Sequence, residues 1–368
     1  MLYNWQQKDW TQFSYDTDKF KQLATRFREL SGQSMGILKS LSPVEQETSL
    51  ITLLVMEALK TSAIEGEIIS RADMMSSIKK KLGLPTPSFV IKDKRSEGIA
   101  ELLVKSRATF AENLNENVLF DWHKLLMRGN YSIEVGTWRS HAEPMQVISG
   151  AIGKAEIHFE APPSATVPDE MAQFIRWFND SKPDGATPID NLIVRSAIAH
   201  LYFETIHPFE DGNGRMGRII AEKSLAQQLE RPILMSLSAT IEADKKSYYD
   251  ALKKGQRSNH INDWIDYFGN MLLKSQENFI EMIAFSLKKM RFFDNNRMFL
   301  NERQEKVMAR MLAEEGEFVG GMNAKKYQAI AKTSKATATR DLQDLIEKQL
   351  IVSKGAGRNT NYQVNLDV

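Results

Sequence analysis

Apolar residues recur at helical spacing on both sides of a short polar stretch near the middle of the chain. Upstream of that stretch they predict an amphipathic helix over Asn191–Ile206. Pro208 disfavours the α conformation at His207, so this helix should end there. Downstream the helical spacing resumes, and a second helix should begin near Asn213. The apolar positions are Ile193, Val194, Ala197, Ile198 and Leu201, then Ile219, Ile220 and Leu225.

Helical patterns also cover much of the N-terminal half. Ser42-Pro43-Val44-Glu45 combines a serine cap, a proline at the first helical position and a glutamate three residues after the cap. Because Gly66 is a natural helix end, a helix is predicted over residues 42–66. Further helices are predicted over residues 70–82, 97–110 and 117–127. The expected fold class is therefore mainly α.

Residues 145–160 break this helical pattern. Two short stretches rich in β-formers flank a turn that contains Gly150 and Gly153, and Pro162-Pro163 closes the segment. Such a pattern predicts a small β-hairpin.

The C-terminal region has the pattern of a separate unit. Helices are predicted over residues 301–312, 325–332 and 334–348, with Thr333 as the cap of the last helix and residues 316–321 as a linker. Residues 350–352 and 361–364 should form a hairpin around Gly355-Ala356-Gly357-Arg358. Three helices and a basic-tipped hairpin resemble a winged helix. Its candidate phosphate contacts are Lys332, Lys335, Arg340, Lys354 and Arg358, although Asp341, Asp344 and Glu347 share the predicted recognition helix.

These patterns divide the chain into three parts. Residues 1–35 form a short aromatic segment whose large side chains are expected to anchor in the core. Residues 36–290 form the main helical core, which includes the helix at 42–66 and the hairpin at 145–160. Residues 300–368 form the domain that resembles a winged helix.

Composition narrows the function. The chain has 368 residues, 42% hydrophobic and 26% charged, as in globular proteins that bury a large core. Its net charge of +1 gives no chain-wide attraction for polyanions. The absence of cysteine excludes disulfides, thiolate metal sites and cysteine nucleophiles. We expect a cytoplasmic protein, because the sequence lacks a signal-peptide pattern and a membrane-spanning apolar run.

The polar stretch between the two central helices holds the densest chemistry. It reads His207-Pro208-Phe209-Glu210-Asp211-Gly212-Asn213-Gly214-Arg215-Met216-Gly217-Arg218. It contains a proton acceptor, an acid able to hold a cation, glycines that permit unusual backbone angles, and two arginines suited to phosphate. The start of the second helix adds free N–H groups that bind anions. This set suits the transfer of a phosphorus-centred group.

Two other interpretations of these residues fail. Gly212–Gly217 satisfies the dinucleotide pattern G-x-G-x-x-G, but that pattern requires a preceding strand, and the preceding segment here is predicted to be helical. His200 and His207 lie seven residues apart, but no carboxylate or third histidine completes a zinc pattern. His123 and His200 are instead expected to be core histidines.

The whole stretch matches the signature H-P-F-x-[D/E]-G-N-G-R-x-x-R, and on this basis the chain resembles the Fic family. Most members of that family transfer AMP from ATP to a hydroxyl side chain of a target protein. The resemblance implies that His207 takes the hydroxyl proton and that Asp211 holds Mg²⁺ at the phosphates. The remaining implied roles are an anion hole at Gly212, Asn213 and Gly214, and phosphate binding by Arg215 and Arg218.

The end of the predicted helix at 42–66 carries a second family feature. Thr61-Ser62-Ala63-Ile64-Glu65-Gly66 fits the Fic inhibitory pattern [S/T]-x-x-x-E-[G/N], and Thr61 and Glu65 share one helix face. Its location is similar to the class whose inhibitory helix precedes the core. In that class the glutamate pairs with the second motif arginine, here Arg218, and blocks the productive position of the γ-phosphate.

The resemblance also assigns two further parts of the site. The hairpin at 145–160 would be a flap that aligns an extended target segment, with Ile157, His158, Phe159 and Glu160 bordering the nucleotide. Tyr248-Tyr249-Asp250-Ala251-Leu252 with Gln256 is similar to a family segment that lines the adenine pocket. Packing of Tyr248 and Tyr249 in the core is the alternative.

The function implied by the resemblance is Mg²⁺-dependent AMP transfer from ATP to Ser, Thr or Tyr of a protein, with low resting activity. Alternatives are transfer of UMP, removal of AMP from a target, and a winged-helix DNA-binding regulator whose core senses nucleotide. A target protein is the expected partner. A homodimer and DNA stay open as partners, and no membrane partner is expected.

Overall fold

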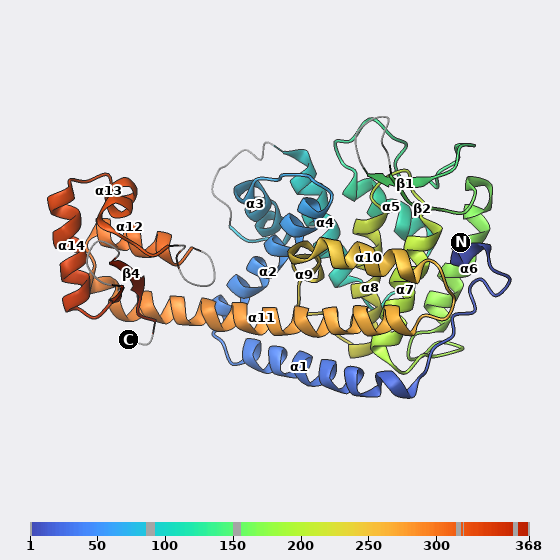
Figure 1. Ribbon diagram of the computed structural model, residues 1–368, viewed down its shortest axis with the longest axis horizontal. Coiled ribbons are helices and arrows are strands. Elements are labelled where there is room, and N and C mark those ends of the chain that lie inside the picture. Colours follow the sequence, from blue (N-terminus) through green and yellow to red (C-terminus); the bar gives the residue numbers. More distant parts are fainter. Residues whose placement is uncertain are drawn as a thin grey trace. The chain divides into compact units, whose positions relative to one another are not determined.

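The computed structural model describes residues 2–85, 93–149, 156–313, 318, 320–355 and 360–366. It is mainly helical, which confirms the predicted fold class (Figure 1). The chain forms two compact units, Met1–Phe279 and Ile280–Val368. No helix in the described part of the chain is both long and apolar enough to cross a membrane.

The first unit contains helices α1 to α10, the hairpin strands β1 and β2, and the first half of α11. Its elements are α1 (Lys21–Lys39), α2 (Pro43–Ile64), α3 (Arg71–Lys81), α4 (Lys94–Ala108), α5 (Glu116–Leu126), β1 (Gln146–Ser149), β2 (Glu156–Glu160), α6 (Val167–Asp180), α7 (Leu192–Ile206), α8 (Asn213–Leu229), α9 (Leu237–Ala243) and α10 (Lys245–Gly255). Helix α11 (Asn262–Asn296) continues into the second unit.

Helix α7 is the central element of the first unit. Every residue from Leu192 to Ile206 is buried, which corrects the prediction of an amphipathic helix. The reason is that α1, α6 and α8 all pack against it, with α7 and α8 side by side in Figure 1. Its polar residues therefore need internal partners: Arg195 donates to the main-chain oxygens of Phe178 and Ser224, at 2.8 and 2.9 Å. The end of α7, where the motif begins, is thus held in the core.

Helix α2 begins and ends as predicted. Ser42 and Glu45 form the capping box, with the Ser42 N–H donating to Glu45 Oε2 at 2.7 Å. The helix ends at Ile64, and Gly66 follows in the left-handed region at φ 79°, where a side chain would be strained. Buried Glu57 ties the middle of α2 to the start of α9 by accepting hydrogen bonds from Ser236 and Ser238.

The predicted hairpin is present as the antiparallel pair β1–β2. Gln146 pairs with Glu160, and Ile148 pairs with Ile157 after an irregularity in the register. Its turn, which was predicted at Gly150 and Gly153, lies outside the described residues.

The N-terminal aromatic residues anchor in the first unit, as expected. Trp10 and Phe13 pack edge-on against Tyr202 of α7, with ring centres 5.2 and 5.6 Å away. Trp5 reaches the hairpin, where its indole N–H donates to the main-chain oxygen of Glu160 at 2.8 Å. The segment before α1 therefore bridges the core and the hairpin.

The second unit combines three short helices and a hairpin with the second half of α11. Its elements are α12 (Glu302–Met311), α13 (Ala324–Ala331), α14 (Lys335–Glu347), β3 (Ile351–Lys354) and β4 (Asn361–Val364). Strands β3 and β4 are antiparallel, and Met322 forms an isolated antiparallel bridge with Tyr362. Half of the predicted linker at 316–321 (residues 316, 317 and 319) and residues 356–359 of the hairpin tip, Arg358 included, lie outside the described residues.

The cap of α14 differs from the prediction. Ser334, rather than Thr333, is the cap, and its Oγ accepts the Thr337 N–H at 3.2 Å. Thr333 instead donates its main-chain N–H to Gln328 of α13. The cap lies one residue later than predicted. Lys332 turns the chain in the left-handed region, so that α14 also starts one residue later.

Candidate active site

The 207–218 motif opens onto a cavity of about 670 Å³ in the first unit. We call it the motif cavity, defined by His207, the loop Asp211–Gly214 and Arg218. The hairpin, α10 and the end of α2 supply further walls. Segments far apart in the sequence therefore meet at one hollow, which is the arrangement that ligand sites commonly use.

His207 follows the last residue of α7 and takes a left-handed conformation, with φ 52° and ψ 59°. That conformation is costly for a residue with a side chain. Buried Arg139 offsets the cost, because its Nε donates to the His207 oxygen at 2.8 Å and its Nη2 donates to the Ile206 oxygen at 3.2 Å. Its main-chain N–H also donates to Pro208. Arg139 thus fixes the turn that projects the imidazole.

The imidazole of His207 lies mostly away from solvent. Burial lowers the pKa of His207 to about 4, with a further lowering from the charge of Arg139. The ring is therefore neutral at neutral pH and able to accept a proton. Glu204 lies beside it, with Oε2 3.9 Å from Nδ1.

The loop after His207 leads directly into α8. Gly212, at φ 82°, is the residue before the helix, and α8 begins at Asn213 as predicted. The Asn213 side chain closes the loop, accepting the Phe209 N–H at 2.9 Å and donating to the Phe209 oxygen at 2.7 Å. Its main-chain N–H, at the helix start, is the group that suits an anion. At Gly214 a Cβ atom would lie 3.0 Å from Glu65 Oε1, so glycine permits this close approach.

Asp211 presents a half-exposed carboxylate to the motif cavity. Its Oδ1 accepts the Gly212 N–H at 2.6 Å, and its Oδ2 lies 3.7 Å from Arg215. Mg²⁺ commonly uses one or two carboxylates together with substrate phosphates. The described residues contain no group of three or more His, Cys, Asp or Glu side chains that could hold a metal ion.

His123 and His200 are core histidines, as expected. His123 stacks on Phe209 with ring centres 4.0 Å apart, and its Nε2 lies 3.1 Å from the Asp211 main-chain oxygen. His200 Nε2 lies 2.7 Å from the Tyr248 hydroxyl. Both rings support the site without facing it.

Arg218 is buried and fully engaged by the end of α2. Its Nε donates to Thr61 Oγ1 at 3.0 Å, and its Nη2 donates to Glu65 Oε1 at 2.8 Å. Burial alone would raise the pKa of Glu65, but the charge and hydrogen bond of Arg218 outweigh it and the pKa falls below its usual value. Lys245 of α10 donates to the Ile64 oxygen and so holds the end of α2 over the cavity. We call the contact between Glu65 and Arg218 the Glu65–Arg218 pair.

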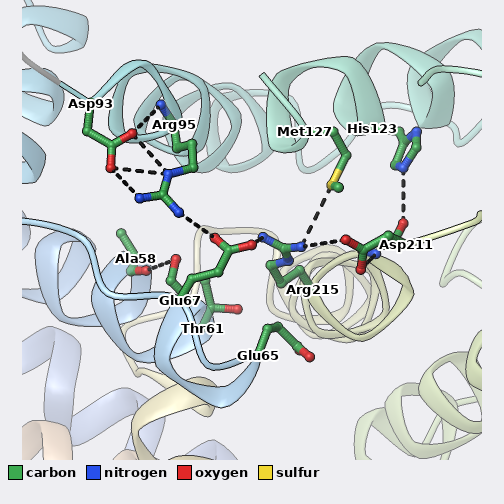
Figure 2. Close-up of polar contacts among 12 residues, drawn as sticks. Ala58, Thr61, Glu65, Glu67, Asp93, Arg95, His123, Met127, Asp211 and Arg215 are labelled. Atoms are coloured by element: carbon green, nitrogen blue, oxygen red, sulfur yellow. Dashed lines mark hydrogen bonds and ion pairs between the residues drawn. The ribbon is translucent and has the colours of Figure 1, made fainter. Parts of the chain in front are cut away.

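Arg215 is placed differently from Arg218. Its Nη1 donates to Glu67 Oε1 at 3.0 Å, while Nη2 lies near Asp211 and Met127 Sδ (Figure 2). It lines a second cavity of about 540 Å³ rather than the motif cavity. In Figure 2 Glu67 also faces Arg95, which Asp93 holds in turn. The structure therefore brings Arg218, and not Arg215, to the motif cavity.

The hairpin residues divide into two groups. His158 and Phe159 line the motif cavity, whereas Ile157 and Glu160 do not. Ile157 is half exposed, and Glu160 accepts a hydrogen bond from Gln146 at 2.8 Å. Phe159 is buried against Tyr3.

The residues expected at an adenine pocket all line the motif cavity. Tyr248 is buried, Tyr249 is 42% exposed, and their ring centres are 5.2 Å apart. Gln256 donates from Nε2 to the Glu204 main-chain oxygen at 3.2 Å. Tyr248 and Gln256 thus combine core packing with a place in the cavity wall, and Tyr249 offers the open ring.

Sequence reasoning missed four charged residues of this site: Arg139, Glu204, Lys245 and Glu67. Their partners are set by tertiary contacts, and none of the four belongs to a recognisable local pattern. Only Glu204 carried a usable signal, because it lies one helical turn before His207 and so shares its helix face.

Parts of this sequence match known families and proteins. Residues 3–84 match a domain of unknown function, DUF4172, and residues 113–225 match the Fic/DOC family. A probable protein adenylyltransferase of Aquifex aeolicus is 29% identical over 182 residues, covering 47% of this chain and 52% of that protein. The protein adenylyltransferase Fic of Nematostella vectensis is 23% identical over 197 residues, covering 53% and 41%. The chain thus spans about half the length of these curated relatives.

The fold has known counterparts as well. The crystal structure of a Fic-domain signalling protein of Bacteroides thetaiotaomicron superposes with a TM-score of 0.53 at 18% identity, covering 70% of this chain and 97% of that one. The likeness at this identity concerns the fold. The 113–225 match includes every residue of the 207–218 motif. The chain therefore contains a domain of the Fic/DOC family.

Proposed function

We propose that the protein transfers AMP from ATP to a Ser, Thr or Tyr hydroxyl of a target protein. The observation that carries this proposal is the motif cavity, where neutral His207 lies with Asp211, the start of α8 and Arg218. The names of the relatives in Aquifex aeolicus and Nematostella vectensis support the same activity.

Each group has a defined part in this reaction. His207 takes the proton of the target hydroxyl, whose oxygen forms a bond to the α-phosphorus of ATP. The bond from that phosphorus to the bridging oxygen breaks, and pyrophosphate leaves. The N–H groups at the start of α8 and the Arg218 guanidinium hold phosphate charge. Asp211 would hold Mg²⁺, which supplies neutralisation of the phosphates when bound.

We further propose that Glu65 keeps the resting activity low. In the Glu65–Arg218 pair it occupies the Arg218 guanidinium, and it approaches the start of α8 at Gly214. A triphosphate that needs these groups must displace a carboxylate whose pKa is lowered and which is therefore charged at neutral pH. Thr61 holds the other face of Arg218, so the guanidinium is kept in position for its anionic partner.

The donor is tested with ATP carrying its label at either the α- or the γ-phosphate. We expect the Glu65→Gly protein to retain label on itself or on a lysate protein from α-labelled ATP and none from γ-labelled ATP. Chelation of Mg²⁺ should remove the signal. Retention of γ-label would identify a kinase reaction instead. Stronger labelling from α-labelled UTP than from α-labelled ATP would identify UTP as the donor.

A second candidate function concerns the second unit. We propose that its α12–α14 helices and β3–β4 hairpin form a winged helix that binds DNA through α14. The objection that acidic residues share α14 is weakened, because Asp341 is buried and accepts hydrogen bonds from Arg303 and Tyr327. Lys335 and Arg340 are exposed on the same helix.

A gel-shift experiment with genomic fragments tests this binding. Replacing Lys335 and Arg340 with alanine should reduce the slope of log affinity against log salt by about one per residue removed. The matched control replaces Lys306 and Arg310, two exposed basic residues of α12. Equal binding by both double variants, or none by the wild type, would contradict the proposal.

A further inference from the structure

Glu204 is a buried carboxyl beside the reacting histidine. It lies in the last turn of α7, it lines the motif cavity, and its Oε2 is 3.9 Å from His207 Nδ1. Among the described residues, Glu204 Oε1 and His207 Nδ1 are buried and lack a well-formed hydrogen bond, although the Glu204 main-chain oxygen also faces the His207 ring. Two polar atoms left without partners are costly in a protein interior. A small movement that brought Glu204 Oε2 to His207 Nδ1 would give the imidazole nitrogen a side-chain partner.

The protein makes specific room for this carboxyl. A Cβ atom at Gly217 of α8 would lie 2.3 Å from Glu204 Oε1, so any larger residue would collide with it. Gln256, the residue after α10, donates to the Glu204 main-chain oxygen at 3.2 Å, which fixes the last turn of α7. Gly217 thus leaves space for the carboxyl, and Gln256 holds the backbone that carries it.

The proposed reaction requires one tautomer of His207. To take a hydroxyl proton on Nε2, the neutral ring must carry its own proton on Nδ1. An acceptor at Nδ1 selects this tautomer and stabilises the imidazolium that forms when Nε2 is protonated. Of the carboxyl groups in the described part of the site, Glu204 is the one for which an ion-pair distance to this ring is found.

We propose that Glu204 is a positioning residue for His207. The Glu204 carboxylate accepts a hydrogen bond from His207 Nδ1–H, which leaves His207 Nε2 free to take the proton of the target hydroxyl. This inference rests on the proposed AMP transfer and adds to it a group that orients the histidine. The proton moves from the hydroxyl to Nε2, while the Nδ1 proton stays shared with Glu204.

The charges around Glu204 link its contact with His207 to the Glu65–Arg218 pair. Burial raises the pKa of Glu204 to about 8; the charge of Arg218 on α8 opposes the rise, and the charge of Glu65 at the end of α2 adds to it. The other titratable groups that face it are His207 and His200 near α7, and Tyr248 and Tyr249 of α10. Because the accepting form is the ionised one, activity should increase as pH rises toward 8. Removing Glu65 should shift that increase to lower pH.

The test uses the full chain in the Glu65→Gly background. Glu204→Gln should lower the rate of AMP transfer about 10- to 100-fold and flatten the increase with pH, because the amide cannot ionise. Glu204→Asp should restore part of the rate. Glu222→Gln is the matched control, because burial raises the pKa of Glu222 to about 8 too, but Glu222 does not line the motif cavity. This control should keep both the rate and the pH profile.

A second measurement does not depend on activity. Nitrogen-15 NMR of the histidine rings, with His207 assigned by its loss in His207→Ala, reports which ring nitrogen carries the proton. The Nδ1-protonated form should dominate above pH 8 in the Glu204 protein and lose population in Glu204→Gln. An unchanged tautomer and rate in Glu204→Gln would overturn the inference and assign the role to the Glu204 main-chain oxygen, which also faces the ring. Absence of any AMP transfer by Glu65→Gly itself would instead refute the proposed function.

Discussion

Replacing Glu65 with glycine is expected to raise ATP-dependent self-labelling of the protein about 10- to 100-fold, since a coupling of roughly 1–3 kcal/mol between two sites corresponds to such a factor. The variant removes the carboxylate that Arg218 holds at 2.8 Å and opens the approach to Gly214. Arg218 keeps its hydrogen bonds to Thr61, so it remains in place to bind phosphate. The gain should therefore appear as productive binding of ATP without a loss of structure.

The measurement is the initial rate of incorporation from α-labelled ATP, at matched concentrations of the two proteins. Glu47→Gln is the control, because it removes one exposed negative charge from the opposite end of the same helix α2. Glu47 does not line the motif cavity. Circular dichroism checks that both variants stay folded. Equal rates in wild type and Glu65→Gly, with ATP bound by both, would refute the inhibitory role.

Lowering the pH within the physiological range should not raise the labelling rate in the way that Glu65→Gly does. The Arg218 contact lowers the pKa of Glu65 below its ordinary value, so the pair is fully formed above that ordinary value and is lost only as pH falls through the lowered one. We expect release of the pair at neutral pH to need either the substitution or a partner that moves the end of α2.

Replacing His207 with alanine in the Glu65→Gly protein is expected to lower the labelling rate about 10²- to 10⁴-fold, the usual contribution of a general base. The imidazole lies in the motif cavity and is neutral because burial lowers its pKa to about 4. Alanine leaves the cavity walls and the phosphate-binding groups in place. ATP binding, measured by calorimetry with Mg²⁺, should therefore change far less than the rate.

His141→Ala serves as the matched control for this loss. His141 pairs with Glu210 of the motif loop, at 3.3 Å, but does not line the motif cavity. Its removal should leave most of the labelling. Labelling retained by His207→Ala would show that another group takes the hydroxyl proton, and an equal loss in both variants would indicate damage to the loop rather than to the chemistry.

The sequence alone predicted the local features of the site well. Pro208 ends α7 before His207, and Gly212 leads into α8 at Asn213, because proline and glycine restrict or permit backbone angles wherever they occur. The capping box at Ser42 and the end of α2 near Gly66 follow from equally local hydrogen bonds. The chemical inventory of residues 207–218 needed no tertiary contact to be recognised.

Only the tertiary structure distinguished residues that look equivalent in the sequence. Arg215 and Arg218 belong to one motif, yet Glu67 turns the first toward a second cavity, while Thr61 and Glu65 hold the second at the motif cavity. Helix α7 was predicted to be half-buried from the spacing of a few apolar residues but is buried on all sides, because that spacing cannot show how many neighbours cover a helix.

The sequence thus determined which chemical groups are present and where the backbone turns, since both depend on residues next to one another. The tertiary structure decided which distant groups meet: Glu65 reaches Arg218 across 153 residues, and Arg139 reaches the His207 main-chain oxygen across 68. Such pairs form only after packing has excluded water, because it is burial that makes an unpaired charge costly and a paired one specific.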